Sequence, residues 1–480
     1  KKKKKIIIIF FIIEIIFFPP PFPIPILFAL TVPAAASVAL GDDLTQKDTL
    51  VHQETQLSTN VFWSNAYSDL RTENFVTYTP NTSVTPIVTY GGALSSCNTI
   101  SSTASALEQQ GYRVVAGMNG DFYNVNNGLP IGIVVSNGEL KSSDGGYWAI
   151  GFRANGSAVL GKPVMKVTAD LGYELLDDSG FPTRVTRQLT SVNKARVSTS
   201  GIYLYTYDFN SKHTTGTTEP GVDVVCTIES GTLAMNGDPL VLRVDSVLTD
   251  AAGTAVPQGK VVLSVNNQAD AYHVNALKNI PVGGTVTLTA APSTGDWVDV
   301  QYAVGALYSL VQNGAVVSGL PSEVNPRTAV GQKADGTLVF YTIDGRKTGH
   351  SIGASMTQVA QRLIELGCVT ALCLDGGGST TFTVTQPDAT TAKTINKPSG
   401  GSERAVSNQI FLVSSNQPSG ELGHFYVSAD NDYVLAGSKV KITASAVDTN
   451  YIPMSGRSYT PSTSAGGVSN GVLDTPASDG

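Results

Sequence analysis

Apolar and polar positions alternate along most of the chain, a pattern that predicts strands far more often than helices. The run "YRVVAGMNGDFY" (112–123) predicts a strand that leads into a loop, and "PIGIVVSNGELKSS" (130–143) predicts a hairpin. The turn of that hairpin is Asn137-Gly138, a pair suited to positive φ at both positions. Residues 160–295 continue in β-like runs with few chemically distinctive clusters, so we expect an inserted, variable β-rich layer or subdomain there.

Two short segments have the spacing of helices. "SSTASALEQQG" (101–111) begins with hydroxyl residues and ends at a glycine, as a short helix does. "SMTQVAQRLIELG" (355–367) predicts a second helix from its apolar positions Met356, Val359, Ala360, Leu363 and Ile364. "CVTALCLD" follows as a buried strand that ends at Asp375.

The segment "NPRTAVGQKADGTLVFYTIDGR" (325–346) predicts a hairpin that turns at Asp335-Gly336. With a two-residue turn, counting outward along the ladder places Arg327 opposite Asp344. We therefore expect a guanidinium and a carboxylate to face each other at the open end of this hairpin, where an exposed pair of this kind adds less than ~1 kcal/mol of stability.

The character of the chain changes near its C-terminal end, where "SKVKITASAVD" (438–448) alternates cleanly. It resembles the start of an immunoglobulin-like β-sandwich, which needs roughly 100 residues. Residues 421–480 are too few, so we expect a truncated sandwich; the alternative is a C-terminal strand pair of the main domain. The fold class predicted is α+β: a mixed, β-rich catalytic domain with a few helices over 75–415, after an N-terminal extension at 40–74.

The N-terminal end has the layout of a secretory signal. Five lysines precede an apolar stretch, and the small residues 34–39 offer A-x-A cleavage sites after Ala36 or Ala39. Prolines and Glu14 interrupt the apolar stretch, which argues against a retained membrane anchor. We therefore expect residues 1–39 to be a signal peptide and the protein to be secreted, extracellular or associated with the cell envelope.

Charge and cysteine usage narrow the function classes. Without residues 1–39 the chain has 26 basic and 37 acidic residues, a net charge of −11, which disfavours a nucleic-acid partner. Four cysteines in a secreted chain allow disulfides, but Cys368 and Cys373 on one extended strand would lie too far apart to pair with each other. The sequence contains no C-x-x-C, which argues against a zinc knuckle.

The most distinctive motif is "LDGGGSTT" (374–381), which follows the predicted strand directly. Gly376, Gly377 and Gly378 can expose successive backbone N–H groups to an anion, and Ser379 and Thr380 add hydroxyls beside the Asp375 carboxylate. Taken alone, the motif is equally consistent with a tight glycine turn.

A second polar loop contains Asn119 and Asp121 within "NGDFY", where amide, acid and aromatic side chains suit a sugar; the alternative is an Asn-Gly turn with packed aromatics. Arg327 suits phosphate or carboxylate, and Arg346 offers a second cation. We interpret His350 as a lone surface histidine, with an acid/base role as the alternative.

These motifs occur together in a recognisable order. "GMNGDFYN", "NPRTAVG", "IDGR", "SIGASMTQVAQRLIELG" and "LDGGGSTT" resemble the phosphodiester glycosidase family, in the manner of a bacterial secreted member. The resemblance extends over roughly 75–413 and is weak through 160–295. It implies a mixed α+β catalytic domain that hydrolyses a sugar-1-phosphodiester, such as an N-acetylglucosamine-1-phosphodiester, on a phosphorylated glycan.

The resemblance also implies a set of site residues, for which the roles are our own hypothesis. A phosphate monoester leaves readily, so stabilising the departing anion matters more than protonating it. Arg327 would be the catalytic cation that stabilises this anion, together with the glycine-loop N–H groups and the hydroxyls of Ser379 and Thr380. Asp375 or Asp121 would act as nucleophile or base, and Asp344 would orient Arg327 or bind sugar hydroxyls. Substrate would be bound by Asn119, Gly376, Gly377, Gly378, Ser379, Thr380 and Arg346. The scheme requires no metal and no cofactor; the alternative is a metal ion held by the clustered aspartates.

Two other functions compete with this interpretation. A serine hydrolase fits poorly, because "GGSTT" lacks the final glycine of G-x-S-x-G and no His-Asp pair is apparent in the sequence. A non-catalytic glycan-binding or adhesion protein of the cell envelope, with its C-terminal region associated with the cell wall, would use the same polar residues without turnover.

Overall fold

The computed structural model describes residues 7–8, 39–197, 201–430, 433–463 and 466–476. Most of the predicted signal peptide therefore lies outside the described residues. The chain divides into two compact units, a larger one of residues 36–385 and 391–415 and a smaller one that includes 416–480. The larger unit holds every predicted site residue.

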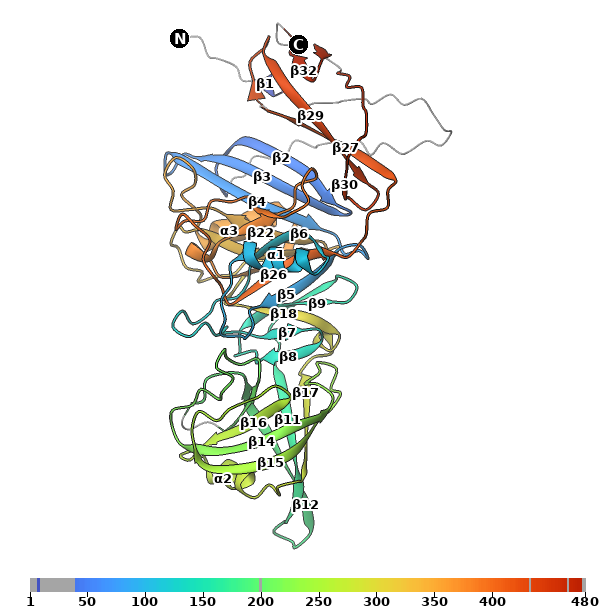
Figure 1. Ribbon diagram of the computed structural model, residues 1–480. Coiled ribbons are helices and arrows are strands. Elements are labelled where there is room, and N and C mark those ends of the chain that lie inside the picture. The colour runs from blue at the N-terminus through green and yellow to red at the C-terminus, as the bar shows by residue number, and fades with distance from the viewer. Residues whose placement is uncertain (1–6, 9–38, 198–200, 431–432, 464–465, 477–480) are drawn as a thin grey trace. The chain divides into compact units, whose positions relative to one another are not determined.

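The largest open sheet of this unit has eight antiparallel strands, in the order β2-β3-β4-β22-β21-β23-β19-β20 (Figure 1). Their bounds are β2 Asp42–His52, β3 Thr55–Ser64, β4 Asp69–Tyr78, β22 Leu338–Ile343, β21 Arg327–Lys333, β23 Cys368–Cys373, β19 Tyr308–Gln312 and β20 Ala315–Val316. The predicted hairpin (β21, β22) and the predicted buried strand (β23) are thus neighbours at its centre.

Two five-stranded sheets accompany it. One has the order β25 (Lys393–Thr394), β24 (Phe382–Val384), β6 (Arg113–Asn119), β26 (Asn408–Ser414) and β5 (Thr85–Tyr90). The other has the order β10 (Ala158–Gly161), β9 (Trp148–Arg153), β18 (Val300–Ala306), β7 (Val134–Ser136) and β8 (Glu139–Ser142). Asn137 and Gly138 join β7 to β8 with φ of 51° and 74°, which confirms the predicted hairpin and its turn.

The three sheets share one apolar core. Buried side chains from each sheet meet in it, among them Phe340 and Leu372 of the large sheet, Met118 and Phe382 of the second, and Ile150 and Val304 of the third. Because β6 and β23 both run into this core, the loops that follow them emerge from it next to each other.

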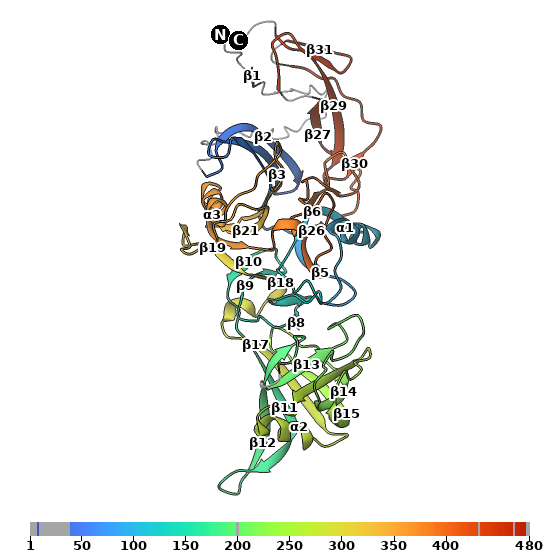
Figure 2. The ribbon, with the colours of Figure 1, turned by 90° about the vertical axis from the view of Figure 1, so that its left-hand side faces the viewer.

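Two helices cover the outer faces of the sheets, as Figure 2 shows. Helix α3 (Met356–Glu365) packs on the large sheet and begins with a capping box between Ser355 and Gln358. Helix α1 (Ile100–Gln109) packs on the sheet that contains β6. Both confirm the predicted helices to within a residue or two at each end.

Residues 165–292 form a closed barrel within the larger unit, with the strand path β11-β12-β13-β16-β14-β15-β17. The bounds are β11 Met165–Leu176, β12 Pro182–Val192, β13 Ile202–Thr206, β16 Lys260–Asn266, β14 Gly221–Ser230, β15 Leu240–Ala251 and β17 Thr285–Pro292, with helix α2 at Ala271–Lys278. The barrel core continues into Val135 and Ala303 of the third sheet and into Ile133, which directly precedes β7, so the inserted residues are packed onto the rest of the unit.

The predicted register of the β21–β22 hairpin is wrong by one residue. Arg327 pairs with Ile343, and Gln332 pairs with Leu338. The loop has three residues instead of two, because Gly336 adopts φ 88° and the N–H of Lys333 donates to the carbonyl of Thr337 (2.8 Å). Arg327 therefore does not face Asp344 across the ladder.

The smaller unit contains a sheet of β27 (Leu422–Ala429), β29 (Lys439–Asp448), β32 (Val472–Asp474) and β31 (Gly467–Ser469). Strand β30 (Pro453–Met454) pairs with β29, and β28 (Tyr433–Val434) pairs with β1 (Ile7–Ile8). Val440, Ile442 and Ala446 of β29 are buried, as the alternation indicated. An immunoglobulin-like sandwich at this end stays a prediction.

Candidate active site

The two polar loops singled out in the sequence meet at the ends of β6 and β23. The N–H of Asp375 donates to the carbonyl of Gly120 (3.0 Å), and the side-chain amide of Asn119 donates to the carbonyl of Asp375 (2.6 Å). These bonds join loops from two different sheets. The carboxylates of Asp121 and Asp375 consequently lie in one polar cluster.

Asn119 and Thr380 are components of the framework, in contrast to the expectation that they bind substrate. Both are buried, with exposed fractions of 0% and 1%. The hydroxyl of Thr328 donates to the Asn119 amide oxygen (2.9 Å) and lies 3.3 Å from the Thr380 hydroxyl oxygen. Because their polar atoms are used inside the protein, these side chains position the loops.

Asp121 lies beneath the surface of the site, with 1% of its area exposed. Its Oδ2 accepts a hydrogen bond from the N–H of Gly132 (2.7 Å), whereas its Oδ1 is buried without a hydrogen-bond partner. The pKa of this carboxyl is raised to about 7, mainly by burial and to a smaller extent by the charge of Asp375, against the opposing effects of the Gly132 N–H, the Lys194 ammonium and the Phe122 N–H.

The space around Asp121 is closed by glycine. A Cβ on Gly132 would lie 2.9 Å from Oδ2, and a Cβ on Gly305 would lie 2.4 Å from the same oxygen. Neither position therefore accepts a side chain while the carboxyl stays in place.

Asp375 is the more accessible of the two acids. Burial raises its pKa to about 6, while the hydroxyl of Ser379, the guanidinium of Arg404 and the N–H of Gly376 each lower it. Ser379 is itself fully buried, so it supports Asp375 from within the loop. Tyr123 joins the same group, since Asp375 and Arg404 both affect the pKa of its phenol, which burial raises.

The three glycines bring backbone against arginine side chains. A Cβ on Gly377 would lie 3.2 Å from Nη2 of Arg346, and a Cβ on Gly378 would lie 2.3 Å from Nη2 of Arg404. A Cβ on Gly376 would lie 2.8 Å from the carbonyl oxygen of Pro326. The N–H of Gly377 donates to that same carbonyl (2.9 Å), so this amide is used inside the protein rather than offered to an anion.

Arg327 lies beside the glycine loop, but its guanidinium is directed elsewhere. Its Nε donates to the carbonyl of Ala354 (3.2 Å) and its Nη2 to the carbonyl of Glu323 (2.5 Å), and 7% of the residue is exposed. Burial lowers its pKa. The expectation that Arg327 holds the substrate anion is therefore replaced by a role in fixing the adjacent backbone.

The exposed cations at the loop are Arg346 and Arg404. Arg346, which the sequence predicted, has φ 60° and donates from Nε to the side-chain oxygen of Asn325 (3.0 Å). Arg404 was not predicted; its Nη1 lies 3.5 Å from the hydroxyl oxygen of Ser379. It follows no strand signal and stands in a polar stretch, so no local pattern marks it.

Asp344 belongs to a second polar cluster near the glycine loop. It accepts hydrogen bonds from His350 Nε2 (2.8 Å), from the side-chain amide of Asn396 (2.8 Å) and from the N–H of Lys397 (2.9 Å). The Asn396 amide also donates to the carbonyl of Thr380 (3.1 Å), which connects the two clusters. The interpretation of His350 as a lone surface histidine is wrong, because it is paired with a buried carboxylate.

Aromatic rings border the loops on one side. Phe122 and Tyr308 meet edge to face, with ring centroids 6.4 Å apart, and both are partly exposed. Tyr308 pairs with Cys373, two residues before Asp375. A partly exposed ring at this position can stack on the C–H face of a sugar.

The described residues include neither a disulfide nor a cluster of side chains that could hold a metal ion. Cys97, Cys226, Cys368 and Cys373 are all free thiols, so the disulfides allowed by their even number are not formed. Within the ranges that the structure describes, no group of three or more His, Cys, Asp or Glu side chains could hold a metal ion.

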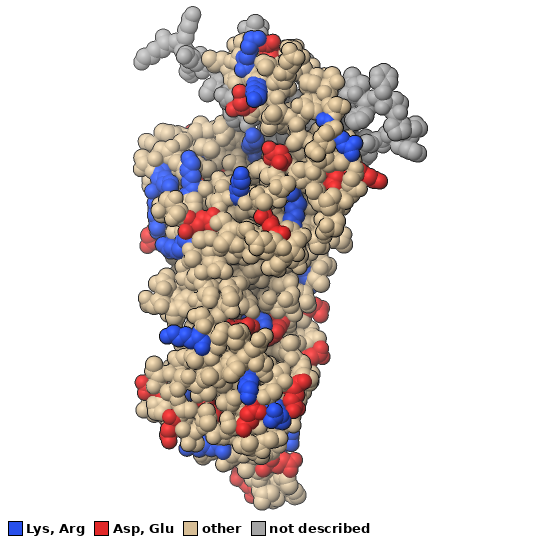
Figure 3. Space-filling model, in the orientation of Figure 1, with Lys and Arg blue, Asp and Glu red and all other residues tan. Residues whose placement is uncertain are grey.

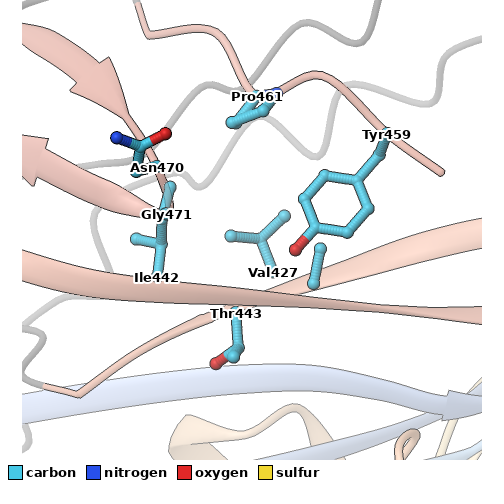
Figure 4. Close-up of a pocket in the computed structure, with 8 residues that line it drawn as sticks. Val427, Ile442, Thr443, Tyr459, Pro461, Asn470 and Gly471 are labelled. Atoms are coloured by element: carbon cyan, nitrogen blue, oxygen red, sulfur yellow. The ribbon is translucent and has the colours of Figure 1, made fainter.

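The smaller unit has a pocket of its own, of about 270 Å³, between β27, β29 and the residues around Tyr459 (Figure 4). Val427, Ile442 and Pro461 give it a largely apolar lining. None of the predicted site residues lines it.

On the face of the molecule drawn in Figure 3, basic and acidic side chains are interspersed over a mostly uncharged surface.

Comparison with known proteins gives one family match and one sequence relative. The model of the phosphodiester glycosidase family matches residues 229–413. The SPbeta prophage-derived uncharacterized protein YomE of Bacillus subtilis is 43% identical over 88 residues, which are 18% of this chain and 13% of that protein. The match thus spans a small part of the relative's length.

Solved structures of other proteins share the fold. A hypothetical protein from Synechocystis superposes with a TM-score of 0.58 at 19% identity, over 77% of this chain and 64% of that one. A protein described as exported, from Burkholderia pseudomallei, gives a TM-score of 0.51 at 18% identity, over 72% and 74% of the two chains. The zebrafish N-acetylglucosamine-1-phosphodiester alpha-N-acetylglucosaminidase catalytic domain superposes more loosely, with a TM-score of 0.37 at 12% identity over 77% and 88%.

The matched range contains Arg327, Asp344, Arg346, Asp375 and the three glycines, whereas the "NGDFY" loop precedes it in the chain and is joined to it by the hydrogen bonds described above. Residues 229–413 of this chain match the phosphodiester glycosidase family, which confirms over that range the resemblance seen in its motifs.

Proposed function

We propose that the protein hydrolyses a sugar-1-phosphodiester, such as an N-acetylglucosamine-1-phosphodiester, on an extracellular or cell-envelope glycan. The products are the free sugar and a phosphate monoester. One observation supports this most: two carboxyl groups of raised pKa lie beside a glycine loop bordered by two exposed arginines.

The two carboxyls divide the work by their surroundings. Asp375, the more accessible and more acidic, is the ionised carboxylate that acts on the anomeric carbon or on the attacking water. Asp121, deeper and less acidic, holds its proton near neutral pH, so that two adjacent negative charges are not required. The pair is active with one proton, which gives a bell-shaped pH dependence of kcat/KM.

The arginines act on the leaving group. Hydrolysis breaks the bond between the anomeric carbon and the phosphate oxygen; water supplies hydroxyl to the carbon and a proton to the phosphate side. Arg346 and Arg404, which adjoin Gly377 and Gly378, would stabilise the charge that gathers on the departing phosphate monoester, because guanidinium groups bind such oxygens in pairs. Phe122 and Tyr308 hold the sugar ring.

The setting proposed is outside the cell. The described part of the chain contains no helix long and apolar enough to cross a membrane. The solved structure from Burkholderia pseudomallei is of a protein described as exported. Both are compatible with secretion, and association of the C-terminal region with the cell wall remains part of the proposal.

The test is a panel of sugar-1-phosphodiesters, with release of phosphate monoester followed by phosphorus NMR. We expect turnover by the wild-type protein and a loss of at least ~100-fold in Asp375→Asn, the scale for removing a key electrostatic group. Arg184→Ala, at an exposed arginine paired with Asp170 on the barrel, serves as the matched control. Saturable glycan binding without phosphate release by wild type would instead support the glycan-binding alternative and overturn the enzyme.

A further inference from the structure

The barrel contributes a partly buried cation to the surroundings of Asp121. Lys194 follows β12, and its ammonium donates to the carbonyls of Pro130 (2.8 Å), Ile131 (3.0 Å) and Gly132 (2.9 Å). An ammonium has three N–H donors, and here three successive carbonyls accept them. The charge is therefore fully hydrogen-bonded without a direct carboxylate partner.

The segment that Lys194 holds is the one that binds Asp121. The carbonyl of Gly132 accepts from Lys194, and the N–H of Gly132 donates to Oδ2 of Asp121. Lys194 thus acts on Asp121 through the single residue Gly132. A Cβ at this position would clash with the Asp121 carboxylate.

The lysine is held in turn by the start of the connection in which it stands. Asn193 adopts φ 50°, and its side-chain amide donates to the carbonyl of Lys141 (2.8 Å) and to the hydroxyl of Thr206 (2.8 Å). The N–H of Val192 donates to the hydroxyl of Ser143 (2.7 Å). Hydrogen bonds between the barrel and the β7–β8 hairpin therefore hold the backbone next to Lys194 in place.

We propose that Lys194 is a positioning residue of the active site, through which the inserted barrel fixes residues 130–132 around Asp121 and sets the protonation of that acid. This inference rests on the proposed function, since it assigns Asp121 a part in the reaction. With this role of Lys194, the barrel takes part in positioning the catalytic residues.

The charges around the pair agree with the geometry. The charged groups that act on Asp121 are Lys194, which lowers its pKa, and Asp375, which raises it. Burial lowers the pKa of Lys194 to about 8, and the charges of Asp121 and Asp144 oppose that effect. Removing the ammonium leaves burial and Asp375 unopposed by a cation, so the pKa of Asp121 is expected to rise.

The test compares Lys194→Met and Lys194→Arg in the full chain, with Lys278→Met at an exposed lysine of α2 as the matched control. The pH dependence of kcat and KM is measured on the phosphodiester that wild type hydrolyses. We expect Lys194→Met to lose roughly 10- to 100-fold in kcat with little change in KM, the range found for residues that orient a reacting group. The high-pH side of its pH–rate profile, where Asp121 loses its proton, should move to higher pH. In Lys194→Arg this side of the profile should return to the wild-type position. Limbs that stay in place while kcat falls would show a merely structural lysine and overturn the proposal.

A second readout is independent of activity. Titration of the Asp121 carboxyl is followed by infrared spectroscopy with isotope-labelled aspartate, and Asp121→Asn assigns the signal. An upward shift in Lys194→Met is expected, and an unchanged titration would refute the role of the lysine. If wild type hydrolyses no sugar-1-phosphodiester, the proposed function fails and this titration still decides the coupling.

The free energy of unfolding gives a third readout. The unfolding transitions of Lys194→Met, Asp121→Asn and the double variant measure the coupling of the two groups. We expect the effects of the two substitutions not to add, because Lys194 and Asp121 bind the carbonyl and the N–H of the same residue, Gly132. Strict additivity would overturn the proposal.

Discussion

Replacing Asp121 by asparagine is expected to remove a defined pH dependence from the stability of the protein. The pKa of this buried carboxyl is raised from 3.8 to about 7, so the folded protein holds a proton that the unfolded chain releases near 3.8. Wild-type stability from this group is therefore fully present below pH 3.8 and is lost as the pH rises through about 7.

The size of the effect follows from the same shift. A rise of about 3 pH units at about 1.4 kcal/mol each gives about 4 kcal/mol. The asparagine of the variant does not ionise, so the stability of Asp121→Asn relative to wild type should increase by about 4 kcal/mol between about pH 4 and about pH 8. The added amide group would occupy the place of the unpartnered Oδ1, at a pH-independent cost of about 1–3 kcal/mol.

The assay is urea unfolding of both proteins at a series of pH values, with the free energy of unfolding extrapolated to water. Asp335→Asn is the matched control, for which the change of stability with pH should have the opposite sign. Hydrogen bonds from Thr337 lower the pKa of this exposed acid, so wild type gains stability from it as the pH rises. A stability difference between Asp121→Asn and wild type that stays constant over the whole range would refute the reasoning, as would one that favours wild type increasingly at high pH.

The remaining predictions concern the arginines and the glycine loop. Arg404→Ala is expected to lower kcat about 100-fold in steady-state kinetics, because it removes the cation beside the loop. Gly378→Ala should approach the same loss, because its methyl group would lie 2.3 Å from Nη2 of Arg404 and would displace that guanidinium. Arg327→Ala should cost about 1–3 kcal/mol in unfolding free energy, since buried carbonyls lose their donor, while the folded variant keeps most of its activity; a large loss of kcat at full stability would contradict this. Arg362→Met leaves Glu73 buried without its cation and should destabilise the fold by about 3–5 kcal/mol in urea unfolding; a change below about 1 kcal/mol would contradict it.

Local patterns in the sequence predicted the elements that carry the site. The apolar spacing of α3, the strand before Asp375 and the Asn137-Gly138 turn each depend on neighbours a few residues away, and all three were predicted correctly. The hairpin register failed for an equally local reason, because one residue in the left-handed region, Gly336, lengthens the loop and shifts every pair.

The parts that could not be predicted depend on contacts distant in sequence. Lys194 and Asp121 are 73 positions apart in the chain and come together only because the barrel closes and packs on the third sheet. Arg404 reaches Ser379 from a loop without regular structure. Asn119 looks like a ligand-binding amide in the sequence, and only the meeting of two sheets shows that its hydrogen bonds are used internally.

The position of bond cleavage tests the central claim most directly. A sugar-1-phosphodiester is hydrolysed by the wild-type protein in water enriched in oxygen-18, and both products are examined by mass spectrometry. Attack at the anomeric carbon, as proposed for Asp375 and the arginine-bordered loop, predicts the heavy oxygen in the free sugar. Heavy oxygen in the phosphate monoester would show attack at phosphorus and would contradict a glycosidase mechanism.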